Sequence, residues 1–83
     1  ILTMMANDNA QYITWYLSLD EERFASSYEN CLRSLYYLDE ICKSLEKIKD
    51  DDTRDVCGSA IHYTALFNEL YSILEDRIGK HSS

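Results

Sequence analysis

Apolar residues recur along this chain at alternating steps of four and three residues, in two separate segments. In the first segment the repeat runs through Phe24, Tyr28, Cys31, Leu35, Leu38, Cys42 and Leu45. In the second segment it runs through Cys57, Ala60, Thr64, Phe67, Tyr71, Leu74 and Ile78. A stripe with a mean period of about 3.5 residues lies along one side of a helix and is stable only when another helix covers it. The pattern therefore predicts two long helices that pack side by side.

Polar residues around these segments predict where the helices begin and end. Asp8 with Gln11, and Ser18 with Glu21, have the spacing of a capping box, which satisfies free backbone N–H groups at a helix start. Gly79 is expected to stop the last helix. We expect a single helical domain whose segments are a flexible N-terminus (1–7), a short helix (8–18), two long helices (20–49 and 53–78) and a tail (79–83).

The apolar stripes are wider than a two-helix hairpin needs. Further apolar residues flank them, namely Leu32, Tyr36, Ile41 and Ile48 in the first long helix and Ile61, Tyr63, Leu66, Leu70 and Ile73 in the second. The short first helix cannot cover two long ones along their whole length. We therefore predict an all-α fold, in which a short helix precedes a long antiparallel helical hairpin that homodimerisation completes as a four-helix bundle. The alternative is that another protein covers the exposed apolar face.

Composition agrees with an all-helical chain and suggests where it resides. The 83 residues include no Pro and only two Gly, the residues that punctuate strands and loops, and 46 % are apolar. No apolar run reaches the ~18 residues that a membrane-spanning helix needs. The three Cys are an odd number and lie within the stripes, whereas disulfide-rich secreted domains place even numbers in loops. We expect a cytoplasmic protein in a reducing compartment.

Charge restricts the partners. Fifteen acidic and eight basic residues give a net charge of −7, so phosphate backbones and anionic membranes should repel the chain. Direct binding to nucleic acid or to a membrane is therefore not expected. An acidic surface can attract a basic protein, and it can equally serve only to keep the chain soluble.

No arrangement of residues in the sequence predicts a reaction. Asp50, Asp51 and Asp52 lack the alternating oxygen ligands and the Gly of a Ca²⁺ loop, so we expect a turn between helices there. Cys57 and His62 are five residues apart, which separates them by about 140° around a helix and prevents a nucleophile and base pair. Zinc, di-iron and phosphate-loop motifs are also missing from the sequence. We predict no enzymatic activity, no cofactor and no metal.

Aromatic residues are the remaining clue to function. The chain has seven Tyr and one Trp, side chains that suit surfaces exposed in one state and covered in another. The expected interface residues are Tyr12, Trp15, Tyr16, Phe24, Tyr28, Tyr36, Tyr63, Phe67 and Tyr71. We predict a small acidic module that binds, and by binding can inhibit, a partner protein, with a second copy of the chain as a further partner. In the alternative, a dimer sequesters a nucleotide-like metabolite in a slot lined by Arg23, Arg33, Tyr36 and Tyr63.

Overall fold

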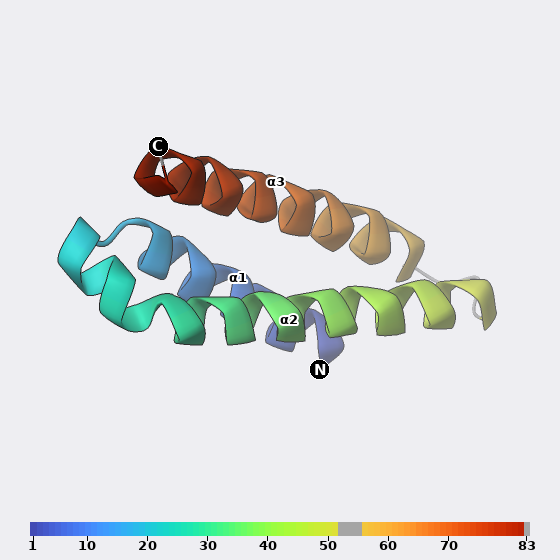
Figure 1. Ribbon diagram of the computed structural model, residues 1–83. Coiled ribbons are helices and arrows are strands. Elements are labelled where there is room, and N and C mark those ends of the chain that lie inside the picture. Colours follow the sequence, from blue (N-terminus) through green and yellow to red (C-terminus); the bar gives the residue numbers. More distant parts are fainter. Residues whose placement is uncertain (52–55, 83) are drawn as a thin grey trace.

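The protein is a bundle of three helices. The computed structural model describes residues 1–51 and 56–82. In these two ranges the helices are α1 (Leu2–Leu17), α2 (Glu21–Asp51) and α3 (Val56–Ser82), and there is no strand. α2 and α3 run antiparallel, α1 lies alongside them, and the end of α3 comes close to the turn that joins α1 to α2 (Figure 1). The all-α fold predicted from the apolar periodicity is confirmed.

The apolar core lies between the three helices. Its buried residues are Ala6, Ala10 and Ile13 of α1, Phe24, Cys31, Leu35, Leu38, Ile41, Cys42 and Leu45 of α2, and Ala60, Leu70 and Leu74 of α3. On α2 the predicted stripe is buried at every position except Tyr28, which is half-buried. The alternating spacing therefore located the core side of α2 correctly.

The core side of α3 differs from the predicted stripe. Tyr71, a stripe residue, is 45 % exposed, whereas Leu70, expected at the flank, is buried. Because α3 contacts α1 as well as α2, its buried side lies between these two neighbours. The predicted stripe assumed that α3 packs against α2 alone. It is therefore rotated around the helix relative to the side of α3 that is buried. Cys57 lies among the residues whose side chains the structure does not describe.

α1 begins earlier than predicted. Residues 1–7 were expected to be flexible, but the helix starts at Leu2, and Ile1 precedes it without a side-chain capping bond. Leu2 and Ala6 both pack into the core, and this packing explains why the first turns are helical. Asp8, expected as a cap with Gln11, lies inside the helix and is exposed. At ~1.5 Å per residue α1 is roughly 24 Å long, so it covers more of the hairpin than the sequence indicated.

The turn between α1 and α2 also differs from the predicted capping box. Ser18 ends α1, since its backbone N–H and its hydroxyl both donate to the carbonyl oxygen of Trp15, over 3.0 and 2.6 Å. Asp20 begins α2, because its Oδ1 accepts from the backbone N–H of Arg23 over 2.9 Å. Glu21, the expected partner of Ser18, lies in the first turn of α2. The positive end of the helix dipole stabilises a carboxylate at this position.

The far ends of the long helices extend past the predicted bounds. α2 continues to Asp51, where we had expected it to end at 49. α3 runs through Gly79 to Ser82, so the expected stop and the tail over 79–83 are wrong for residues 79–82. No described Gly has a positive φ, so Gly79 adopts an ordinary helical conformation. The predicted start of the third helix at 53 lies outside the described residues.

Candidate functional site

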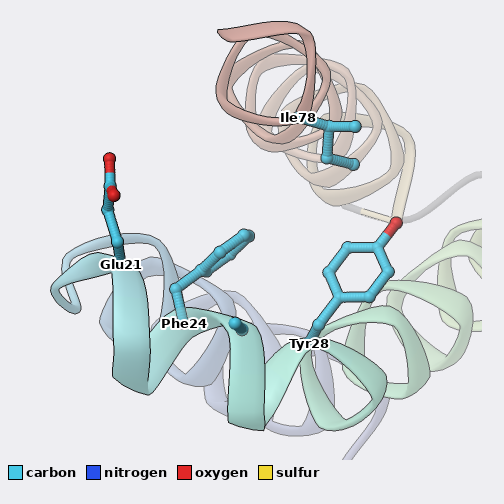
Figure 2. A pocket seen from close by; sticks show the side chains of 5 residues that line it. Glu21, Phe24, Tyr28 and Ile78 are labelled. Atoms are coloured by element: carbon cyan, nitrogen blue, oxygen red, sulfur yellow. The ribbon is translucent and has the colours of Figure 1, made fainter. Parts of the chain in front are cut away.

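An apolar groove opens between the first turns of α2 and the last turns of α3. Its lining residues are Glu21, Phe24, Ala25 and Tyr28 of α2 and Ile78 of α3, around a volume of about 350 Å³. Figure 2 shows Phe24 and Tyr28 pointing from α2 toward α3, with Ile78 facing them. The two rings meet edge to face, with centroids 5.9 Å apart. We call this surface the α2–α3 groove.

Helical spacing extends the groove toward the middle of the hairpin. On α2, Leu32 follows Tyr28 by one turn and is 38 % exposed. On α3, Tyr71 precedes Ile78 by two turns, is 45 % exposed and contacts the ring of Phe67 with centroids 6.0 Å apart. Helical spacing thus places Leu32 and Tyr71 in line with the groove, and we call the groove together with these two side chains the apolar strip.

Carboxylates border this apolar strip. Glu21 lines the groove at one end, and Glu75, exposed, precedes Ile78 by three residues on the same side of α3. Farther along α2, Asp39 and Glu46 lie close enough to the buried Cys42 for their charge to contribute to the raised pKa of its thiol. Carboxylates therefore border the apolar strip with two cations among them, since Lys43 lies 3.2 Å from the Asp39 carboxylate and Arg77 contacts the Phe24 ring.

Arg77 holds the end of α3 against the turn between α1 and α2. Its Nη1 donates to the carbonyl oxygen of Leu17 over 2.6 Å, and its Nη2 donates to that of Leu19 over 2.5 Å. Its Cζ lies 4.0 Å from the ring centroid of Phe24, a cation–π contact. Spacing along the chain does not predict this role, because an arginine in the last turns of a helix usually interacts with the helix dipole. Arg77 positions Phe24, and thereby the floor of the groove.

A second hollow lies between α1 and α2, on the other side of α2. Its volume is about 390 Å³, and its lining residues are Leu2, Met5 and Asn9 of α1 and Tyr37, Glu40, Ile41 and Ser44 of α2. Ile41 follows Tyr28 by thirteen residues, a rotation of about 140° around the helix. The α1–α2 hollow and the α2–α3 groove therefore face different directions.

The predicted interface residues occupy three environments. Tyr12, Trp15, Tyr36 and Tyr71 are exposed, Tyr16, Tyr28, Tyr63 and Phe67 are half-buried, and Phe24 is buried. The structure brings Phe24 and Tyr28 together in the groove, and Trp15 meets Tyr16 edge to face on α1. The nine residues therefore differ in how much of each side chain a partner could contact, and their place at an interface stays a prediction.

The four residues of the predicted ligand slot do not converge on either hollow. Arg23 is exposed and lies 3.9 Å from the Asp20 carboxylate in the same helix. Arg33 is exposed, and Tyr36 is 61 % exposed beside Tyr37. Tyr63 is half-buried on α3 beside His62, with ring centroids 4.8 Å apart. Neither the groove nor the α1–α2 hollow is lined by any of them.

The described thiols are buried in the core. Cys31 and Cys42 are free, and burial is the main cause that raises the pKa of each. The positive charge of Arg77 partly opposes the rise for Cys31, and the Thr64 hydroxyl beside Cys42 partly opposes it there. The side chain of Cys57 lies outside those that the structure describes, so its separation from His62 stays a prediction. His62 itself is exposed.

Comparison with known proteins identifies no relative. No family model matches the chain, and searches of curated proteins and of solved structures find no match. Among the side chains that the structure describes, those of residues 1–48 and 58–79, His, Cys, Asp and Glu form no group that could hold a metal ion. The same part of the chain contains no helix with the length and apolar character needed to cross a membrane.

Proposed function

We propose that this protein is a small acidic protein-binding module that acts without catalysis, by associating with a partner protein and blocking the surface it covers. The observation that carries this proposal is the apolar strip along the open side of the hairpin. Phe24, Tyr28 and Ile78 form its floor, and Leu32 and Tyr71 extend it at 38 % and 45 % exposure. Exposed apolar surface bordered by polar groups is typical of protein interaction sites.

The kind of residue also favours a protein partner. Aromatic side chains with a polar end are enriched in protein interfaces, where they supply contact area at a small cost in conformational entropy. Tyr12, Trp15, Tyr36 and Tyr37 are each more than half exposed. The small-ligand alternative has no comparable support, because Arg23, Arg33, Tyr36 and Tyr63 line neither hollow.

Affinity capture tests the proposed function. The full chain is immobilised and exposed to an extract of its source cells, and bound proteins and small molecules are both identified by mass spectrometry. We expect a specific protein that the Leu32→Ala, Tyr71→Ala double variant captures less well. Ile73→Ala on α3 is the matched control, since it also removes an exposed apolar side chain but lies about 160° around the helix from Tyr71. Capture of a small molecule alone would contradict the proposal.

Association of two copies is a second part of the proposal. Because α1 covers one side of the hairpin, the pairing would join two three-helix units rather than two bare hairpins. The α1–α2 hollow offers the surface, since Met5 and Tyr37 line it at 45 % and 52 % exposure. Tyr12, two turns after Met5 on the same side of α1, adds a ring that is 59 % exposed. This arrangement leaves the α2–α3 groove open to another protein.

A further inference from the structure

We propose that the outer side of α1 pairs with the outer side of α1 in a second copy of this chain, with the two helices antiparallel. This inference rests on the association of two copies proposed above, and it adds the contacts and the orientation that form the pair. In the pair, the Asp8 carboxylate of each copy accepts a hydrogen bond from the Tyr12 hydroxyl of the other. Met5 of each copy packs on the Trp15 ring of the other.

The outer side of α1 has a stripe of its own, which we call the outer stripe. Its members recur at alternating steps of four and three residues and are Ile1, Met5, Asp8, Tyr12 and Trp15. All five are exposed, and the four apolar members are 93, 45, 59 and 57 % exposed in that order. The buried residues of α1 lie about 150° away around the helix. A stripe of this period is stable in water only when another helix covers it.

The outer stripe is complementary to itself. Asp8 and Tyr12 lie two residues before and after Ala10, and Met5 and Trp15 lie five residues before and after it. An antiparallel pair with its two-fold axis beside residue 10 therefore brings Asp8 opposite Tyr12 and Met5 opposite Trp15, and each contact forms twice. Parallel helices in register would instead bring Asp8 opposite Asp8 of the second copy, and this repulsion disfavours them.

The opposed side chains also match in chemistry. Among the side chains of residues 1–48 and 58–79, neither the Asp8 carboxylate nor the Tyr12 hydroxyl has a hydrogen-bond partner, so both are available to a second copy. Their hydrogen bond offsets the cost of covering the carboxylate, and it therefore sets register and orientation rather than affinity. The affinity comes from the Trp15 ring and the Met5 thioether, which packs favourably on aromatic rings. Met5 also lines the α1–α2 hollow, so the hollow lies at the edge of the pair.

Charge is compatible with a second copy on this side of the molecule. Each copy has a net charge of −7, and Asp8 is the only charged residue of α1. Between residues 29 and 47, the charged residues on the side of α2 that carries Glu40 alternate in sign, and they are Glu29, Arg33, Glu40 and Lys47. A second acidic chain therefore meets little net charge here apart from Asp8, which the Tyr12 hydroxyl faces.

Charge variants of the outer stripe test the antiparallel pair, with the dimer dissociation constant measured by analytical ultracentrifugation. Tyr12→Glu places a second carboxylate opposite Asp8 at both ends of the pair, so we expect the constant to rise at least about 30-fold. Adding Asp8→Lys to Tyr12→Glu places opposite charges together and should return the constant to within about fivefold of wild type. This rescue is specific to a pair in which residue 8 of one copy faces residue 12 of the other.

Two further variants locate the contact on α1. Trp15→Ala is expected to raise the dimer dissociation constant about tenfold or more, as loss of an aromatic contact does at interfaces. Tyr36→Glu on α2 is the matched control for Tyr12→Glu, because it adds the same charge in place of a ring that is 61 % exposed. It should stay within about twofold of wild type, since Tyr36 lies about 100° around α2 from Tyr37, which lines the hollow. Circular dichroism verifies that each variant is helical.

The results separate this inference from the proposed function. A dimer that persists in Tyr12→Glu, or one that Asp8→Lys fails to restore, would overturn the antiparallel α1 pair while two copies still associate. A monomeric wild type would overturn the pair and the proposed association together. If such a monomer captured a protein and Tyr12→Glu abolished the capture, the outer stripe would belong to that protein instead. Binding of a partner through the apolar strip is tested separately by the capture experiment and survives each of these results.

Discussion

Arg77 shows how a single side chain can link all three helices. It extends from α3, donates to carbonyl oxygens of Leu17 and Leu19 in the turn after α1, and contacts Phe24 of α2. Both carbonyls lie where the helical hydrogen-bond pattern has ended, so they depend on a donor from elsewhere. The planar guanidinium serves both at once, which a lysine ammonium does less well. The geometry of the groove therefore depends on Arg77.

Replacing Arg77 by methionine should destabilise the protein. Arg77→Met retains most of the apolar side chain but removes two charge-assisted hydrogen bonds, so we expect the free energy of unfolding to fall by about 2 kcal/mol. Arg23→Met is the matched control, because Arg23 is exposed and its loss should change stability by less than about 0.5 kcal/mol. Urea unfolding monitored by circular dichroism measures both. Equal stability of the two variants would show that Arg77 does not hold the turn.

The buried thiols should make stability depend on alkaline pH. Burial raises the pKa of Cys31 and of Cys42, so the native thiols stay protonated where those of the unfolded chain ionise, above about pH 8.5. The unfolded state then binds fewer protons than the native state, and the free energy of unfolding falls as pH rises. This contribution is fully present below about pH 8.5 and is lost as pH rises toward the raised native values.

Two measurements separate the thiols from other groups that ionise at alkaline pH. Urea unfolding between pH 7.5 and 9.5 should show a steeper loss of stability for the wild type than for the Cys31→Ala, Cys42→Ala double variant. Iodoacetamide at pH 8.5 should modify Cys31 and Cys42 far more slowly in the native protein than in urea, as peptide mass spectrometry can resolve. Equal rates in the two conditions would contradict the burial of these thiols.

At the scale of the elements, the start of α2 depends on Asp20. Its carboxylate accepts from the Arg23 backbone N–H, so Asp20→Ala should lower the free energy of unfolding by about 1 kcal/mol. Asp8→Ala removes the same charge from inside α1, where alanine is the better helix former, and should leave stability unchanged or slightly raised. Thermal unfolding of both variants measures the difference. A larger loss for Asp8→Ala would instead favour a helix start near residue 8.

The sequence predicted which segments are helical better than it predicted the residues at which the helices begin and end. The stripe of α2 coincides with its buried side apart from the half-buried Tyr28, and the flanking Ile41 is buried as well, because α1 contacts α2 beside the stripe. The ends depended on contacts that spacing does not reveal. Leu2 and Ala6 extend α1 through packing, and two serine hydrogen bonds to Trp15 place Ser18 at the end of α1 rather than at the start of α2.

For the candidate site, the sequence predicted only that aromatic residues would line it. Phe24, Tyr28 and Tyr71 were expected at an interface from their aromatic character, and the structure places the first two in the groove. The role of Arg77 was not predictable, because it depends on two carbonyls that precede it by about sixty residues in the sequence. Arg23 and Tyr36 are thirteen residues apart on α2, about 140° around the helix, so their separation follows from the sequence spacing, whereas the place of Tyr63 depends on how α3 packs.

At the scale of the whole molecule, the chain is elongated. Its Cα radius of gyration is 14.0 Å and its extents are 45 × 22 × 15 Å, whereas a compact domain of this length would have a radius of gyration of about 12 Å. An elongated three-helix unit exposes long helical surfaces, and here two of them have apolar hollows on different sides of α2. These two hollows are the surfaces that we propose for a second copy and for a different protein.

Light scattering after size exclusion tests the proposed pairing of two copies. The 9.7 kDa chain should elute as a dimer at micromolar concentration, and Met5→Ala with Tyr37→Ala should convert it to a monomer, because both residues line the α1–α2 hollow. Tyr71→Ala, in the other strip, should leave the dimer intact. Raising salt should strengthen a dimer of two chains with net charge −7, since screening reduces their repulsion. A wild-type monomer at every salt concentration would contradict the pairing.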